Sequence, residues 1–331
     1  MRSPPTTGPL YGVQYLRAAA AIAVVLFHAA EKTGFHFAIG AAGVDVFFVI
    51  SGFIMWVIGA RREPTPAAFL AARIRRIVPV YWTATAVMVA GGLAGLFPNL
   101  QLSVQHVLAS LFFVPSRSPS SGEIWPVLVQ GWTLNYEMFF YAVFAAALLL
   151  PRIWRLPVIA TFFGLLVLLG ALLAADNAVL VTYTRPIILE FVAGMVIGEF
   201  WLRGRAPGAA AGTVLVVLAL CGFAFIQILG LPFDALICGP LAAALLVGVL
   251  ALEAARRVGV SVPVAFLGDA SYSIYLWHTF AISVTAKLAE KASLPPAMIL
   301  VLSVAFGIFA GIVAYRWLER PVQQYKWRIA G

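Results

Sequence analysis

Runs of apolar residues, each long enough to cross a lipid bilayer, recur along this chain from one end to the other. A helix rises 1.5 Å per residue, so about 20 apolar residues cross roughly 30 Å of hydrocarbon. The 331 residues are 63% hydrophobic and only 11% charged, whereas soluble domains carry about twice that charged fraction. The short alternating segments of a β-barrel do not occur. We therefore expect an all-α, polytopic integral membrane protein.

About ten transmembrane helices are predicted. The expected spans cover residues 12–32, 40–60, 68–96, 131–150, 156–175, 184–202, 209–229, 234–253, 270–289 and 297–317. The longest connection, 98–130, contains SVQHVLASLFFV, typical of an interfacial helix, and PSRSPSSG, whose composition indicates a loop. We expect a single transmembrane domain over 1–331, with no appended soluble domain.

The basic residues indicate the orientation, because loops on the cytoplasmic side carry an excess of Lys and Arg. If the N-terminus is inside, the inner segments carry Arg2, Arg61, Arg62, Arg73, Arg75, Arg76, Arg152, Arg155, Arg203, Arg205, Arg256, Arg257, Arg316, Arg320, Lys326 and Arg328. The outer segments carry only Lys32, Arg117, Arg185, Lys287 and Lys291. Both termini are therefore expected in the cytoplasm. The net charge of +9 lies in these short loops, which argues against nucleic-acid binding.

Two ionisable residues lie within the first predicted span, Arg17 and His28. Eleven residues at 100° each come within roughly 20° of three full turns, so both side chains lie on one face, about 16 Å apart along the axis. An ionisable group inside a span indicates a functional site. The alternative is that Arg17 extends to the interface and His28 is a packed core histidine.

Other ionisable groups are predicted at the depth of His28, near the outer end of their spans. They are Asp45, Glu137, Glu190 and Arg185, with Trp132, Asn135 and Tyr136 beside Glu137. These residues are candidates for catalysis and substrate binding. Ion pairs that fix helix packing, and an interfacial position for Trp132, are the alternatives.

A basic cluster, Arg73, Arg75 and Arg76, faces the cytoplasm at the start of the third span. Positions 73 and 76 share a helix face and can present two guanidinium groups to phosphate. Ordinary inside-positive anchoring is the alternative. His278 lies in the ninth span, either as a core histidine or as the polar lining of a cavity. Cys221 and Cys238 lie in apolar runs, typical of packing residues, and no metal-ligand spacing is present.

These residues fall within an ordered set of motifs. The pieces are VQYLRAAAAIAVVLFHA (13–29), GVDVFFVISGFIM (43–55), RIRRIVP (73–79), GWTLNYEMFFY (131–141), LGDASYSIYLWH (267–278) and LERP (318–321). Together they resemble the membrane-bound acyltransferase-3 family, and more narrowly its exopolysaccharide acetyltransferase branch. Arg17 and His28 match its Arg-x10-His motif, Arg73 and Arg76 its Arg-x-x-Arg motif, and 132–137 its Trp-Thr/Ser-Leu-x-x-Glu pattern.

The resemblance implies transfer of an acyl group, usually acetyl, from cytoplasmic acyl-CoA to a glycan hydroxyl. The glycan would be a cell-surface or lipid-linked polysaccharide, with an exopolysaccharide unit as the first choice. The resemblance also implies that Arg17 and His28 are required for activity, and that the protein lies in a bacterial inner membrane. No metal cofactor is expected.

In the predicted mechanism, neutral His28 is a general base that takes the proton of the attacking hydroxyl. Either Asp45 or Glu137 would accept the other imidazole N–H. The cluster at 73–76 would hold the acyl-CoA phosphates, and Arg17 would position the arm or the pyrophosphate, or pair with an acid. Hydrogen-bond donors for the oxyanion would come from Trp132, Asn135, Tyr136 or Ser51.

Two alternatives remain. His28 could itself be the nucleophile, with an acetyl-imidazole intermediate. The chain could instead be a proton-coupled transporter of a small metabolite or lipid-linked sugar, because such relays also use buried His, Asp, Glu and Arg.

Overall fold

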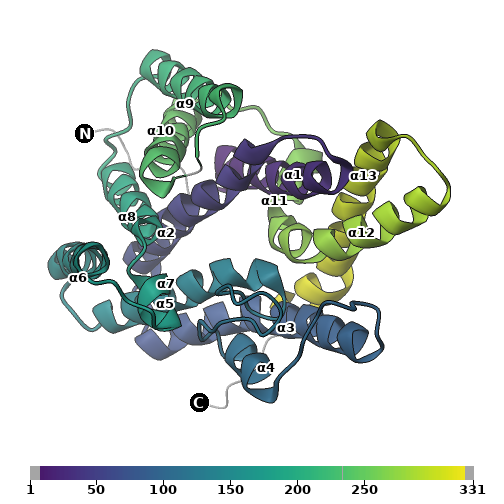
Figure 1. Ribbon diagram of the computed structural model, residues 1–331. Coiled ribbons are helices and arrows are strands. Elements are labelled where there is room, and N and C mark those ends of the chain that lie inside the picture. The colour runs from purple at the N-terminus through teal and green to yellow at the C-terminus, as the bar shows by residue number, and fades with distance from the viewer. Residues whose placement is uncertain (1–7, 233, 325–331) are drawn as a thin grey trace. The chain divides into compact units, whose positions relative to one another are not determined.

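The computed structural model describes residues 8–232 and 234–324, and every regular element within these ranges is a helix. The prediction of an all-α protein is confirmed (Figure 1). The chain divides into two compact units, each built from two separate segments. Unit 1 contains the chain up to Glu63 together with Leu189–Ile312, and unit 2 contains Pro64–Ile188 and the chain from Val313.

Unit 1 contains the first two long helices and a later group of six. Its elements are α1 (Tyr11–Thr33), η1 (Ala38–Ala42), α2 (Gly43–Arg62), α8 (Leu189–Leu202), α9 (Ala209–Leu229), α10 (Ala235–Ala254), α11 (Val262–Asp269), α12 (Ser271–Lys291) and most of α13 (Pro296–Ala314).

Unit 2 is formed mainly by the middle of the chain. Its elements are α3 (Pro66–Leu93), α4 (Val104–Leu111), η2 (Val129–Gly131), α5 (Trp132–Ala147), α6 (Arg152–Leu172), α7 (Ala178–Tyr183), η3 (Pro186–Ile188), η4 (Tyr315–Glu319) and α14 (Arg320–Gln324). α4 is the helix predicted within the long connection, and the Ser103 hydroxyl caps it by accepting from the His106 N–H.

In the described part of the chain, seven helical segments are long and apolar enough to cross a membrane. They are Tyr11–Thr33, Ala38–Arg62, Pro66–Leu93, Arg152–Leu172, Ala209–Leu229, Ala235–Ala254 and Pro296–Gln324. The other three predicted spans are also helical, as α5, α8 and α12. However, α5 and α8 have only 16 and 14 residues, and α12 ends with charged residues.

The count of about ten spans is therefore not confirmed, and the orientation stays a prediction. Arg2, Lys326 and Arg328, on which part of the charge argument depended, lie outside the described residues.

In unit 1, α2 and α8 cross with their backbones in contact. A Cβ at Gly52 would overlap the carbonyl oxygen of Phe191, and one at Gly194 would overlap that of Val49. Two glycines facing each other permit this approach, as in helix pairs packed within membranes. Further along both helices, the Trp56 indole N–H donates to Glu199 at 2.9 Å, so later residues of α2 contact later residues of α8. α2 and α8 are therefore parallel.

The start of α1 is capped by a side chain from another helix. The first helical N–H groups lack partners within a helix. The carboxylate of Glu253, at the end of α10, accepts from the N–H of Tyr11 at 3.2 Å and of Gly12 at 2.5 Å. This contact fixes the depth at which α1 begins, and so the depth of the ionisable residues that it carries.

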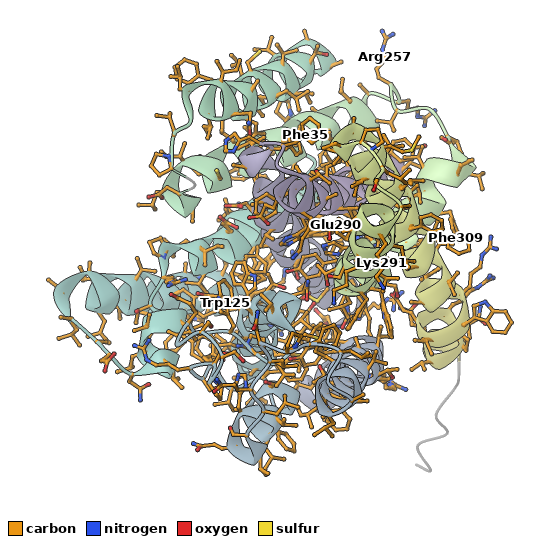
Figure 2. The ribbon with its side chains drawn as sticks, turned by 45° about the vertical axis from the view of Figure 1, so that its right-hand side comes forward. Phe35, Trp125, Arg257, Glu290, Lys291 and Phe309 are labelled. Carbon is orange, nitrogen blue, oxygen red and sulfur yellow. The ribbon has the colours of Figure 1, made fainter. Side chains whose placement is uncertain are left out.

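The outward surface of the helices is rich in large apolar side chains, as expected where hydrocarbon replaces water. Phe309 on α13 is 61% exposed, and Figure 2 shows it projecting from its helix. Arg257 projects from the loop after α10 in the same view.

Candidate active site

Arg17 is held in unit 1 by contacts within α1 and with α12. Its guanidinium donates to the Gln14 side chain at 3.0 Å and to the Ser271 hydroxyl at 3.0 Å. The side chain is only 8% exposed. Arg17 is therefore a buried cation with partners on two helices.

His28 also lies against α12, because its ring centroid is 5.2 Å from that of His278. Arg17 contacts Ser271, the first residue of α12, and His28 contacts His278, two turns further along that helix. The helices α1 and α12 therefore run side by side in the same direction. Both ionisable residues of α1 thus face one neighbouring helix, as expected for side chains that share a stripe.

Glu31 is the acidic partner of His28. The Nδ1 atom of His28 lies 3.2 Å from Oε2 of Glu31, one turn further along α1. A carboxylate only accepts hydrogen bonds, so this contact places the proton on Nδ1 and leaves the lone pair of the neutral ring on Nε2. The His28 side chain is 31% exposed. His28 is therefore oriented and reachable, which are the two requirements of a general base.

His278 is also held in one tautomer. Its Nδ1 lies 3.0 Å from the carbonyl oxygen of Ile274, so Nδ1 carries the proton. The residue is fully buried, and its Nε2 has no hydrogen-bond partner among the described residues. Gly307 of α13 packs against His278, since a Cβ at position 307 would lie 3.4 Å from Cβ of His278. His278 thus presents a lone pair beside His28.

Asp45 and Glu190, two further predicted site residues, face each other in unit 1. Asp45 lies in the first turn of α2 and Glu190 in the first turn of α8, and both are buried. Their carboxyl groups are within hydrogen-bonding reach. The role of Asp45 in orienting His28 stays a prediction. In the structure, Asp45 pairs with Glu190, and His28 pairs with Glu31.

Glu137 belongs to a second network, in unit 2. The Tyr141 hydroxyl, one turn further along α5, donates to Glu137 and also hydrogen-bonds Arg73 of α3. Phe69 lies under this network, with the Arg73 guanidinium 5.9 Å from its ring centroid. A tyrosine hydroxyl therefore links the predicted catalytic acid to the first arginine of the basic cluster.

The other two arginines of the cluster are half-buried on α3. Arg75 donates from Nε to the carbonyl oxygen of Ala71 at 3.1 Å, and Arg76 lies close enough to Arg73 to repel it electrostatically. Arg73 and Arg76 thus place two guanidinium groups close together near the Tyr141 hydroxyl, an arrangement that a phosphate could bridge.

The predicted aromatic residues of α5 form a continuous edge-to-face series in unit 2. Trp132 contacts Tyr136 with ring centroids 5.9 Å apart, and Tyr136 contacts Tyr183 at 6.2 Å. Burial raises the pKa of Tyr183 to about 12, so its hydroxyl stays protonated and can donate. Arg185 is exposed and hydrogen-bonds Tyr136, while Oδ1 of Asn135 is buried without a partner among the described residues.

Two contributors were missed from the sequence, Glu31 and Tyr141. Each had a local signal, because Glu31 follows His28 by three residues and Tyr141 follows Glu137 by four, the spacings of neighbours on one helix face. Among the described residues, no three His, Cys, Asp or Glu side chains gather as metal ligands would.

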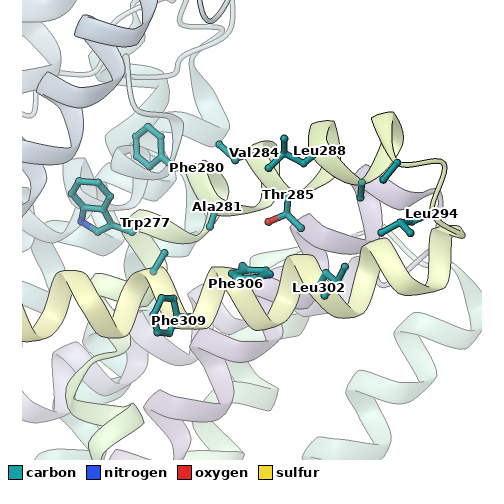
Figure 3. Close-up of a pocket in the computed structure, with 13 residues that line it drawn as sticks. Trp277, Phe280, Ala281, Val284, Thr285, Leu288, Leu294, Leu302, Phe306 and Phe309 are labelled. Atoms are coloured by element: carbon teal, nitrogen blue, oxygen red, sulfur yellow. The ribbon is translucent and has the colours of Figure 1, made fainter.

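An apolar groove of about 540 Å³ runs between α12 and α13 (Figure 3). Trp277 lies at one end and Leu294 at the other, with Phe306 and Phe309 along its floor. Trp277 directly precedes His278 along α12, but neither His278 nor His28 lines the groove. Its lining suits a hydrocarbon chain, because it offers almost no hydrogen-bonding atoms to a sugar.

A helical membrane protein with arginine, histidine and carboxylates buried among its helices is either a membrane-embedded enzyme or a transporter. Comparison with known proteins decides between these classes. The acyltransferase domain that defines the acyltransferase-3 family matches residues 10–317. The chain belongs to this family, and it is a membrane-associated acyltransferase.

Two relatives illustrate the family. The exopolysaccharide production protein ExoZ of Rhizobium meliloti (strain 1021) is 66% identical over 90% of this chain and 94% of its own length. The peptidoglycan O-acetyltransferase OatA of Listeria monocytogenes is 25% identical over 93% of this chain, which spans 55% of that longer protein. No solved structure matches the chain.

Proposed function

We propose that the enzyme transfers an acetyl group from acetyl-CoA, bound from the cytoplasm, to a hydroxyl of a cell-surface or lipid-linked polysaccharide. An exopolysaccharide unit is the first choice, and the inner membrane of a bacterium is the location. The observation that carries the proposal is the His28–Glu31 pair beside His278. The similarity to ExoZ, an exopolysaccharide production protein, supports the choice of polymer, and the similarity to the Listeria peptidoglycan O-acetyltransferase supports O-acetyl transfer.

In the proposed reaction, Nε2 of His28 removes the proton from the attacking hydroxyl. The hydroxyl oxygen bonds to the thioester carbon, the carbon–sulfur bond breaks, and the imidazolium returns its proton to the departing thiolate. Glu31 holds the ring in the required tautomer and stabilises the imidazolium, the role that the sequence assigned to Asp45 or Glu137. Asn135 and Ser51 stay candidates for binding the oxyanion.

The donor phosphates would contact the arginines of unit 2. Arg76 and Arg75 supply net positive charge, while Tyr141 and Glu137 hold Arg73 in place. Arg17 contributes as a positioning residue for the segment of α12 that carries His278, through its bond to Ser271. The apolar groove beside Trp277 supports the lipid-linked form of the acceptor over a free sugar, because a lipid chain can occupy it.

His28→Ala should lower acetyl transfer by about 100- to 10,000-fold, the contribution of a positioned general base. The measurement is transfer of labelled acetyl from acetyl-CoA to the polysaccharide fraction by purified protein. His36→Ala is the matched control, because this histidine is exposed. Activity of His28→Ala near that of the wild type would refute the proposed base.

Labelled acetyl that stays on the protein in the absence of acceptor, and disappears in His28→Ala, would favour the nucleophile mechanism over the base mechanism.

Arg76→Ala should weaken CoA binding about ten- to a hundredfold, since a hydrogen bond to a charged group contributes about 1.5–3 kcal/mol. Binding can be measured by calorimetry with CoA in detergent. Arg62→Ala removes the same charge from an exposed position at the end of α2 and should leave affinity unchanged. Equal affinities in the two variants would exclude the phosphate role.

A further inference from the structure

The carboxyl groups of Asp45 and Glu190 form a buried pair that the proposed reaction does not require. Asp45 is 0% exposed and Glu190 is 4% exposed. The two acids meet because α2 and α8 are parallel and their backbones are in contact nearby. The contact lies at Gly52, two turns after Asp45, and at Gly194, one turn after Glu190. Phe48 and Phe191, which follow the two acids along α2 and α8, pack against each other with tilted rings whose centroids are 4.7 Å apart.

Apart from the Asp45 backbone N–H near its own carboxylate, none of the four carboxyl oxygens has a hydrogen-bond donor among the described residues. No described arginine, lysine or histidine forms an ion pair with either acid. Each acid lies within hydrogen-bonding reach of the other.

The third helix packed against the pair, α10, supplies no positive charge either. Its groups near the pair are the Cys238 thiol and the carboxylate of Asp234, which caps the helix by accepting from the Leu236 N–H. Gly239 makes room for the acid, because a Cβ there would lie 3.0 Å from Oε1 of Glu190. Among the described residues, the titratable groups that act on the pair are thus a thiol and a carboxyl group.

Two adjacent ionised carboxylates in such surroundings repel each other strongly and lose their hydration. One proton placed between them replaces the repulsion by a charge-assisted hydrogen bond, in which the acid donates to the carboxylate. We propose that Asp45 and Glu190 bind one proton between them in the resting enzyme and act as a single acid–carboxylate unit. This inference does not depend on the proposed transfer reaction.

The bound proton would have a positioning role. It closes the contact between the starts of α2 and α8, and α2 directly follows η1, where a Cβ at Gly40 would lie 2.9 Å from Cβ of Phe27 on α1. Phe27 is adjacent to His28, with ring centroids 4.7 Å apart. The pair thus holds the helix that supports the α1 segment carrying the base, and Asp45 is already engaged with Glu190.

Infrared spectroscopy of the purified protein tests the proton directly. The wild type should show a carboxylic-acid C=O band that shifts in D₂O and is absent from both Glu190→Gln and Asp45→Asn. Glu199→Gln should retain the band, since Glu199 pairs with Arg203 at 2.7 Å and does not belong to the carboxyl pair. A wild-type spectrum without the band, or a band that both pair variants retain, would overturn the proposal.

Thermal melting provides a second readout. Glu190→Gln supplies an amide donor in place of the proton, so its melting temperature should stay close to that of the wild type at neutral pH. The wild type should lose stability at alkaline pH, where the shared proton is lost, and Glu190→Gln should not. Equal alkaline losses in the two proteins would contradict a shared proton. A wild-type melting temperature that is higher in Na⁺ than in K⁺ at the same ionic strength would also contradict the proposal, because it would indicate a bound cation at the site.

Discussion

At the scale of single residues, the proposed chemistry depends on the pairing of His28 with Glu31. The acid lies on the same helix one turn away, so helix geometry alone holds it near the ring. This arrangement keeps the tautomer of His28 independent of how neighbouring helices shift. A base whose orientation is set locally needs only a second helix, here α12, to define its surroundings.

Glu31→Gln should lower the maximal rate about tenfold with little change in KM for the donor. The amide oxygen still accepts from Nδ1, but the charge that stabilises the imidazolium is lost. A hydrogen bond to a charged group contributes about 1.5–3 kcal/mol, and the lower value applies because Glu31 is 57% exposed. Steady-state kinetics measure both constants. Glu290→Gln, near the end of α12, is the control, and an unchanged rate in Glu31→Gln would remove Glu31 from the mechanism.

At the scale of helices, the parallel crossing of α2 and α8 brings two backbones into contact, and it depends on two glycines. A methyl group at either position would meet backbone atoms, which cannot rotate away as a flexible side chain can. The crossing brings Asp45 to Glu190 and places Trp56 against Glu199. Small residues at this crossing are therefore part of how the buried acids are positioned.

Gly52→Ala and Gly194→Ala should each destabilise the protein by about 1–3 kcal/mol, the usual cost of overpacking a core. Gly164→Ala on α6 is the matched control, because a Cβ there meets nothing within 4 Å. That change should be neutral or slightly stabilising, since alanine favours helix. Melting temperatures in detergent compare the three variants, and equal values would contradict the close crossing.

At the scale of the whole molecule, the number of helices that cross the membrane decides the topology. An even number, such as the predicted ten, puts both termini on one side, whereas seven puts them on opposite sides. The difference rests on α5, α8 and α12, which are helical but short or partly polar. Short helices can still cross when neighbouring 3₁₀ turns extend them, as η2 extends α5 and η3 extends α8.

Cysteine labelling with a membrane-impermeant reagent separates the two topologies. With ten spans, Asp176→Cys and Ser293→Cys should both be labelled from outside the cell. With seven, both would be labelled only after permeabilisation. Ser121→Cys and Arg257→Cys are controls, because they lie outside and inside, respectively, in both cases.

The labelling background should be the double variant Cys221→Ala, Cys238→Ala, with transfer activity verified first. Labelling of Asp176→Cys and Ser293→Cys only in permeabilised cells would refute the ten-span prediction.

By itself, the sequence determined the helices, the stripe shared by Arg17 and His28, and the family. Apolar run length and helix periodicity are local properties, so they can be obtained from residue spacing. Glu31 and Tyr141 were predictable on the same grounds, because each lies within one turn of its partner.

Only the tertiary structure decided the partners that come from distant segments. Asp45 meets Glu190, Arg73 meets Tyr141, and His28 meets His278, each across a helix–helix contact. Periodicity defines which face a side chain occupies but not which helix packs against that face. That choice depends on close packing, such as the glycine contact of α2 with α8, and packing is a property of the folded chain.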